Sequence, residues 1–177
     1  MVTTLTPRLR KFVLTVHVTS SVGLLGAIAA FLALAVTGLA SRDDQMVRAA
    51  YLAMNLTAEL VIVPMAFASL LTGLVQSLGT PWGLFQHYWV LVKLLLTVFA
   101  TIVLLVKTEL IGYAALLASE ATLSSAELRA AGIQLVVHAT GGLLVLLVPA
   151  VLSVYKPRGR TPFGRRKEHE QCIVSQL

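Results

Sequence analysis

Residues 12–40 read FVLTVHVTSSVGLLGAIAAFLALAVTGLA, a stretch without a single Asp, Glu, Lys or Arg. A bilayer core about 30 Å thick is crossed by about 20 apolar residues of α-helix, at about 1.5 Å per residue. This stretch is therefore long enough to span a membrane. Three more largely apolar runs follow, at 49–78, 82–106 and 130–155.

The four runs predict an all-α fold: a four-transmembrane-helix bundle of up-down topology that fills residues 1–155. Of the 177 residues, 57% are hydrophobic and 12% are charged, whereas a soluble domain carries about 25% charged residues. The chain therefore has too few polar residues to coat a soluble fold. Residues 156–177 remain as a basic tail, which is too short for a second folded domain.

The positive charge gathers near the two ends of the chain. Most of its 14 Lys and Arg residues lie there, namely Arg8, Arg10, Lys11, Lys156, Arg158, Arg160, Arg165, Arg166 and Lys167. The positive-inside rule then predicts that the N and C termini are both cytoplasmic. We expect the tail to attract anionic lipid headgroups, and we expect no binding of nucleic acid.

Two local features predict departures from straight spans. Pro64 and Pro149 fall inside the second and fourth runs, and each is expected to kink its helix because proline removes a backbone hydrogen bond. The connection at 109–128 contains Ile111 and Tyr113 among polar residues. We expect it to lie on the membrane surface as a short helix.

Ionisable residues at membrane depth are candidates for function because each costs about 2.5–3.5 kcal/mol to insert. Asn55 and Glu59 share one helical face of the second run, and Lys93 lies in the third. Counting from the expected helix ends puts Glu59 and Lys93 both about 16 Å deep, so the two are expected to pair. Such a pair has two interpretations: an ion pair that fixes helix rotation, or part of a proton or ion relay.

The histidines form a second constellation. His17 and His87 are expected about 8–10 Å from the cytoplasmic side, at similar depth on parallel helices. Two such imidazoles suit the axial ligation of haem b, or a shared copper or zinc ion, to which His138 is a further candidate ligand. The alternative interpretation is that each histidine only makes hydrogen bonds between helices.

Four segments resemble an uncharacterised family of small four-helix integral membrane proteins of actinobacterial type: VHVTSSVG (16–23), ASLLTGLVQSLGTPWGLF (68–85), HYWV (87–90) and SVYKPRG (153–159). The resemblance implies a four-span fold in a bacterial plasma membrane and carries no established activity. The histidine of the first helix and the Trp and Lys of the third are also distantly similar to membrane domains of the copper-resistance-D type.

Three functions are compatible with these patterns. The first is a redox or binding role with His17 and His87 as ligands of haem b or a metal ion. The second is a structural or accessory subunit that assembles as a homo-oligomer or within a membrane complex, through small-residue helix faces. The third is a small proton-coupled carrier that uses Glu59, Lys93 and His138. A classical enzyme is disfavoured because the sequence has no phosphate-binding glycine loop and no cysteine-rich metal motif.

Overall fold

The computed structural model of the chain describes residues 6–79, 88–119, 126–155 and 161, and all of its regular structure over these ranges is helical. The predicted all-α fold is therefore confirmed. The elements are α1 (Pro7–Ala40), α2 (Asp44–Thr57), the π-helix η1 (Ala58–Ile62), α3 (Val63–Gly79), α4 (Tyr88–Ser119) and α5 (Ala126–Tyr155). Because α2, η1 and α3 follow one another without a break, they form a single long helix, Asp44–Gly79.

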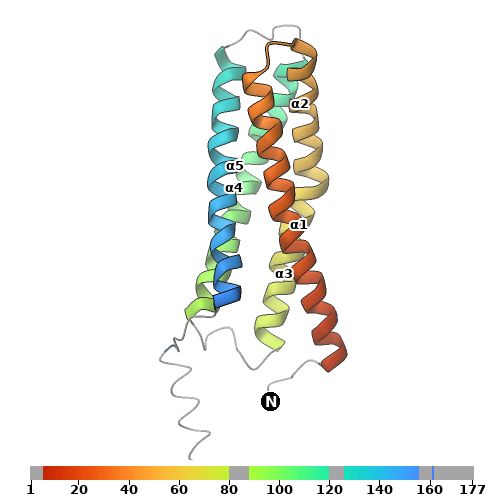
Figure 1. The fold of residues 1–177 in the computed structure, drawn as a ribbon, viewed down its shortest axis with the longest axis vertical. Coiled ribbons are helices and arrows are strands. Elements are labelled where there is room, and N and C mark those ends of the chain that lie inside the picture. Colours follow the sequence, from red (N-terminus) through yellow and green to blue (C-terminus); the bar gives the residue numbers. More distant parts are fainter. Residues whose placement is uncertain (1–5, 80–87, 120–125, 156–160, 162–177) are drawn as a thin grey trace, which may run out of the picture.

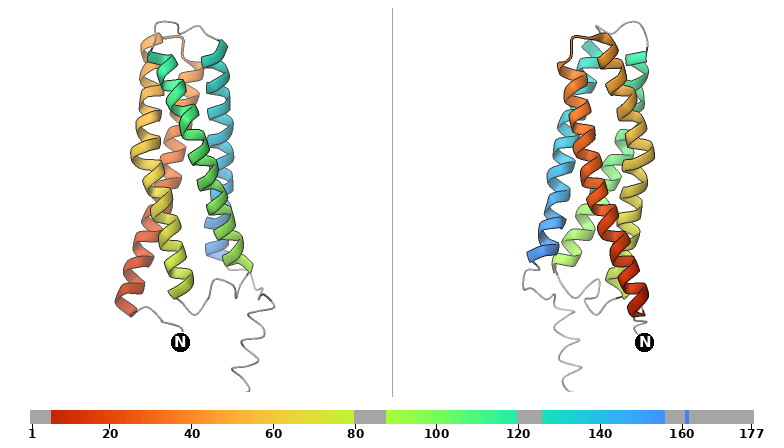
Figure 2. Two further views of the ribbon diagram at one scale, coloured as in Figure 1. Left: turned by 180° about the vertical axis from the view of Figure 1, so that it is seen from behind. Right: turned by 45° about the vertical axis from the view of Figure 1, so that its right-hand side comes forward.

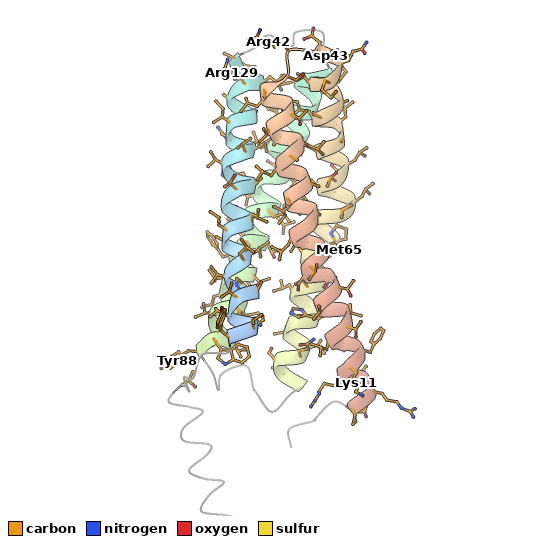
Figure 3. The ribbon with its side chains drawn as sticks, in the orientation of Figure 1. Lys11, Arg42, Asp43, Met65, Tyr88 and Arg129 are labelled. Carbon is orange, nitrogen blue, oxygen red and sulfur yellow. The ribbon has the colours of Figure 1, made fainter. Side chains whose placement is uncertain are left out.

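Four helices in the described part of the chain are long and apolar enough to cross a membrane, which identifies a multi-pass membrane protein. Their outward faces carry large apolar side chains, and Leu60, Val106 and Val154 are 65–77% exposed. A surface so rich in exposed apolar groups is unfavourable in water and favourable in hydrocarbon. Figure 3 shows these side chains projecting from the bundle along its length.

α1 and the long helix Asp44–Gly79 are antiparallel, as two pairs of neighbouring residues show. A Cβ built on Gly38 would lie 3.0 Å from Tyr51 Cε2, and one on Gly23 would lie 3.6 Å from Met65 Sδ. Position along α1 therefore rises as position along α2–η1–α3 falls. We call the end with Pro7 and Tyr155 the termini end, and the end with Ala40 and Asp44 the loop end (Figure 1).

The observed helix boundaries differ from the expected ones. α1 and α2 begin at Pro7 and Asp44, five residues before the apolar runs at 12 and 49, because Pro7 is tolerated in the first turn and the Asp43 side chain accepts a hydrogen bond from Gln45 N at 3.0 Å. The largest difference is at the end of α4, which continues to Ser119 rather than ending at 106. The surface helix expected within 109–128 was therefore wrong over its first half, which belongs to α4.

The kink expected at Pro64 takes the form of a π-turn. Pro64 has no N–H to donate back to Leu60, and the turn just before it widens into η1. There the Val63 N–H donates to the carbonyl oxygen of Ala58, five residues earlier. The widened turn lets the helix continue through the proline, and π-turns of this kind often occur at functional sites.

The apolar core fills only one half of the bundle. Within the described residues, its buried cluster begins at Leu24 on α1 and, on the long antiparallel helix, reaches only to Ala66. Both limits lie near the middle of the helices, so tight packing is confined to the loop half. Towards the termini end, the α1–α3 pair and the α4–α5 pair move apart (Figures 1 and 2).

Tyr51 is closely packed in the loop half, and substitutions at its contacts can test this packing. Its side chain is 2% exposed, and a Cβ added at Gly132 on α5 would overlap its hydroxyl oxygen. We expect Gly132→Ala to lower the free energy of unfolding by about 1–3 kcal/mol through overpacking. Tyr51→Phe removes the obstructing hydroxyl and should relieve much of that cost in the double variant.

Thermal unfolding in detergent, followed by circular dichroism, measures this effect. Gly141→Ala is the control, since nothing lies within 4 Å of a Cβ added there. Equal stability of the Gly132→Ala and Gly141→Ala variants would contradict the packing described for Tyr51.

Candidate functional site

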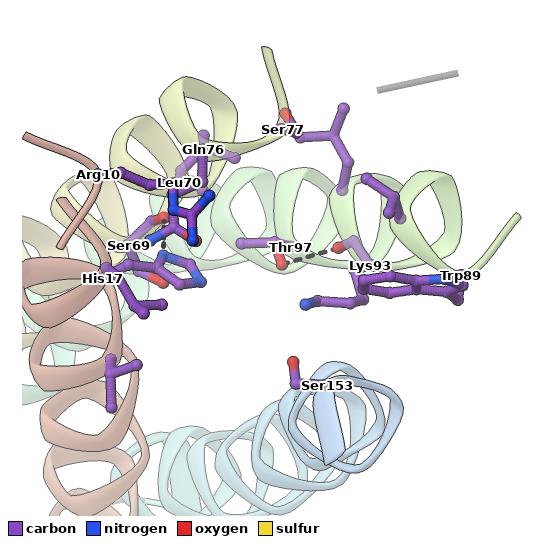
Figure 4. Close-up of a pocket in the computed structure, with 15 residues that line it drawn as sticks. Arg10, His17, Ser69, Leu70, Gln76, Ser77, Trp89, Lys93, Thr97 and Ser153 are labelled. Atoms are coloured by element: carbon purple, nitrogen blue, oxygen red, sulfur yellow. Dashed lines mark hydrogen bonds between the residues drawn. The ribbon is translucent and has the colours of Figure 1, made fainter. Parts of the chain in front are cut away.

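A cavity of about 540 Å³ separates the two helix pairs in the termini half of the bundle. We call it the polar crevice. Figure 4 shows its side chains converging from both helix pairs, across an open space between His17 on one side and Lys93 and Ser153 on the other. Its polar and aromatic lining residues are Arg10, His17, Ser69, Gln76, Ser77, Trp89, Lys93, Thr97 and Ser153.

His17 is held to α3 by its Nδ1 atom. This nitrogen lies 3.0 Å from the carbonyl oxygen of Ser69 and 3.1 Å from Thr72 Oγ1. The Thr72 hydroxyl donates its own proton to the carbonyl of Ala68, at 2.5 Å. Since a carbonyl only accepts, Nδ1 carries the proton and donates it, and the neutral ring therefore keeps its lone pair on Nε2.

Glycine and serine residues make room for this arrangement. A Cβ on Gly73 would lie 3.0 Å from His17 Cε1, so only glycine leaves full space for the imidazole against α3. One turn from His17, Ser21 Oγ and Ser69 Oγ form a hydrogen bond of 2.8 Å across the same pair of helices. These contacts fix the ring, and Figure 4 shows its other nitrogen directed towards the open space.

The crevice is positively charged. Lys93 Nζ lies 5.2 Å from the centroid of the Trp89 ring, which favours the ammonium by a cation–π interaction. Arg10 lines the same cavity from α1. None of the described residues that line it is an Asp or Glu. Two cations beside a hydrogen-bond-accepting imidazole, on largely apolar walls, suit an anion that also has an apolar part.

Gln76 adds an unused hydrogen-bond donor. Its Nε2 atom is buried and has no hydrogen-bond partner in the described structure. Buried polar atoms in folded proteins are nearly always partnered, and an exception calls for an unseen water or ligand. Gln76 lies one turn beyond Thr72 and Gly73 on the crevice side of α3, so a bound acceptor group is a natural partner for it.

The structure separates two of the predicted partners, Glu59 and Lys93. Asn55 lies level with Gly112 on α4, because a Cβ there would be 3.8 Å from Asn55 Oδ1. Counting along both helices from this contact puts Lys93 level with Leu74, and so about 22 Å along the axis from Glu59. The expected equal depth assumed that α4 ended near 106, whereas it continues to Ser119.

Glu59 has a different setting from the one expected. Its side chain is exposed on the π-turn, on the outside of the described bundle. A charged carboxylate exposed on a membrane span is costly, by about 2.5–3.5 kcal/mol. Polar groups from outside these four helices would therefore stabilise Glu59.

His138 lies apart from His17. His87 lies outside the described residues, so its pairing with His17 remains a prediction. His138 donates from Nδ1 to the carbonyl oxygen of Gln134 at 2.6 Å and lines a second cavity. It lies 15 residues, or about 22 Å, along α5 from Ser153 at the crevice. The described structure thus brings Lys93, and not His138, to His17.

Sequence reasoning missed Arg10 and the α3 side of the crevice. Ser69, Thr72, Gly73 and Gln76 recur at the three- and four-residue spacing of one helical face, within an apolar run. That polar and small-residue stripe was visible in the sequence. It was not assigned to a site because no ionisable residue marks it.

No protein-family model, curated protein or solved structure matches the chain. The resemblance drawn from the sequence segments therefore stays a prediction.

Proposed function

We propose that the protein binds an anionic amphipathic ligand in the polar crevice, with Lys93 and Arg10 holding the charged group and His17 accepting a hydrogen bond or a metal bond through Nε2. The observation that carries this proposal is the pair of cations in a cavity whose described lining contains no carboxylate. An ionic group is stabilised more strongly beside low-dielectric walls than in water.

The ligand is proposed to enter from the cytoplasm or the inner leaflet. Arg8, Arg10 and Lys11 lie at the termini end, where the crevice is, and six more basic residues follow Tyr155 in the sequence, against Arg42, Arg48 and Arg129 at the loop end (Figure 3). The positive-inside rule then orients the termini end towards the cytoplasm of a bacterial inner membrane. Anionic molecules at that surface are attracted by the same basic residues.

Binding of a fluorescent long-chain fatty acid to the full chain in lipid nanodiscs tests the proposal. We expect saturable binding that Lys93→Gln weakens about tenfold, since a charge-assisted hydrogen bond contributes about 1.5–3 kcal/mol. Lys11→Gln is the matched control, because it removes the same charge at the same end but does not line the crevice. Equal binding by both variants would refute the proposal.

Haem b is the second candidate ligand, favoured by the fixed tautomer of His17. A histidine whose Nδ1–H donates to a backbone carbonyl presents Nε2 in the manner usual for metal-binding histidines. The two propionates of haem would meet Lys93 and Arg10, and the iron would supply one-electron chemistry. His87 is the second ligand proposed from the sequence. The described residues hold no group of three or more ligands for a bare copper or zinc ion.

Absorption spectra of protein purified from haem-supplied cells test this candidate. We expect a Soret band that His17→Ala abolishes and His138→Ala preserves, because His138 lies outside the crevice. A colourless wild-type protein after reconstitution with haem would exclude haem b and leave the proposal of an anionic ligand intact.

A further inference from the structure

A second cavity, of about 430 Å³, is lined by α1, α4 and α5 and by Ile62 and Ala66 of the long helix Asp44–Gly79. We call it the apolar chamber. Its walls are almost wholly apolar, and they include Leu24, Ile28 and Phe31 of α1 together with Val103 and Leu104 of α4 and Val145 of α5. The chamber occupies the middle of the bundle, where a bilayer is most hydrophobic.

The two cavities meet at Thr97, which lines both. Thr97 Oγ1 donates to the carbonyl oxygen of Lys93 at 2.8 Å, so its hydroxyl proton is already used within α4. The crevice and the chamber are therefore adjacent, and Thr97 forms a wall common to both.

We infer that the ligand is a single-chain anionic amphiphile, with its head in the polar crevice and its hydrocarbon tail in the apolar chamber. The inference rests on the proposed function and adds the chemical class of the ligand. The charges suit an acidic head, either a carboxylate or a phosphate. The chamber suits a tail with no polar groups.

The dimensions of the chamber agree with such a tail. On α4 the lining of the chamber runs from Thr97 to Ile111, and on α5 it reaches Leu135, one turn beyond His138. Lys107 is the first charged residue on α4 beyond Thr97, and the ten helical residues up to it rise about 15 Å. This equals half of a hydrocarbon core about 30 Å thick, the depth reached by the tail of a lipid in one leaflet.

Gly142 offers a way to fill the chamber without touching the crevice. It lines the chamber, and nothing lies within 4 Å of a Cβ added there. A leucine at this position projects into the space that the tail would occupy. Gly26 on α1 is a matched control, since a Cβ there also meets nothing within 4 Å but the residue lines neither cavity.

The test uses a C16 monocarboxylate with a diazirine on its terminal carbon, photolysed with the full chain in nanodiscs. We expect saturable labelling of peptides that line the chamber, reduced at least tenfold by Gly142→Leu and unchanged by Gly26→Leu. Lys93→Gln should raise the half-saturating concentration about tenfold. Parallel labelling experiments with a matched C16 alkyl phosphate and a matched C16 alcohol identify which head group is bound. The alcohol carries no charge and should not label saturably.

Each outcome separates the two proposals. Saturable, Lys93-dependent labelling spread over outward-facing residues, or insensitive to Gly142→Leu, overturns the inference about the tail and leaves the anionic site standing. Absence of Lys93-dependent labelling with both acids overturns both proposals. The labelled positions in the wild-type chain decide the question even if the Gly142→Leu variant does not fold.

Discussion

A lysine deep within a membrane span must keep its ammonium among polar groups. Lys93 meets this constraint by lying over Trp89 and facing a crevice with hydroxyl, amide and imidazole groups. The same constraint explains why the polar residues of α3 cluster opposite it. A closed apolar core at this level would leave the charge without solvation, so the bundle opens there.

The bundle is thus divided along its axis. In the loop half, Tyr51 packs against Gly38 and Gly132, and the buried cluster also forms walls of the apolar chamber, including Leu24 and Leu135. In the termini half, polar contacts such as the His17–Ser69 hydrogen bond join helices without closing the space between them. Small residues let helices approach in lipid, where apolar burial alone gives little attraction between them. Rigid packing at one end can then support an open site at the other.

Much of this fold was predictable from sequence, because a long apolar run is stable in a bilayer as a spanning helix. The ends of the helices were less predictable, because Lys107 and Glu109 are tolerated within α4 and do not end it. Depths counted from those ends were therefore displaced, and this error brought Glu59 to Lys93. The sequence identified His17 as a candidate site residue. Its partners on α3 depend on which faces of the two helices meet, and the residue pattern within one apolar run does not specify that.

The termini half of the bundle is open, whereas the helices around Tyr51 and Ala114 in the loop half are closely packed. Cysteine accessibility in nanodiscs measures this difference directly, with Thr97→Cys and Ala114→Cys each placed in a Cys172→Ser background. Thr97 lines both cavities, and Ala114 is 0% exposed in the core. We expect a water-soluble thiol reagent to modify Cys at position 97 and not at 114. Modification at 114 with protection at 97 would contradict this division of the bundle.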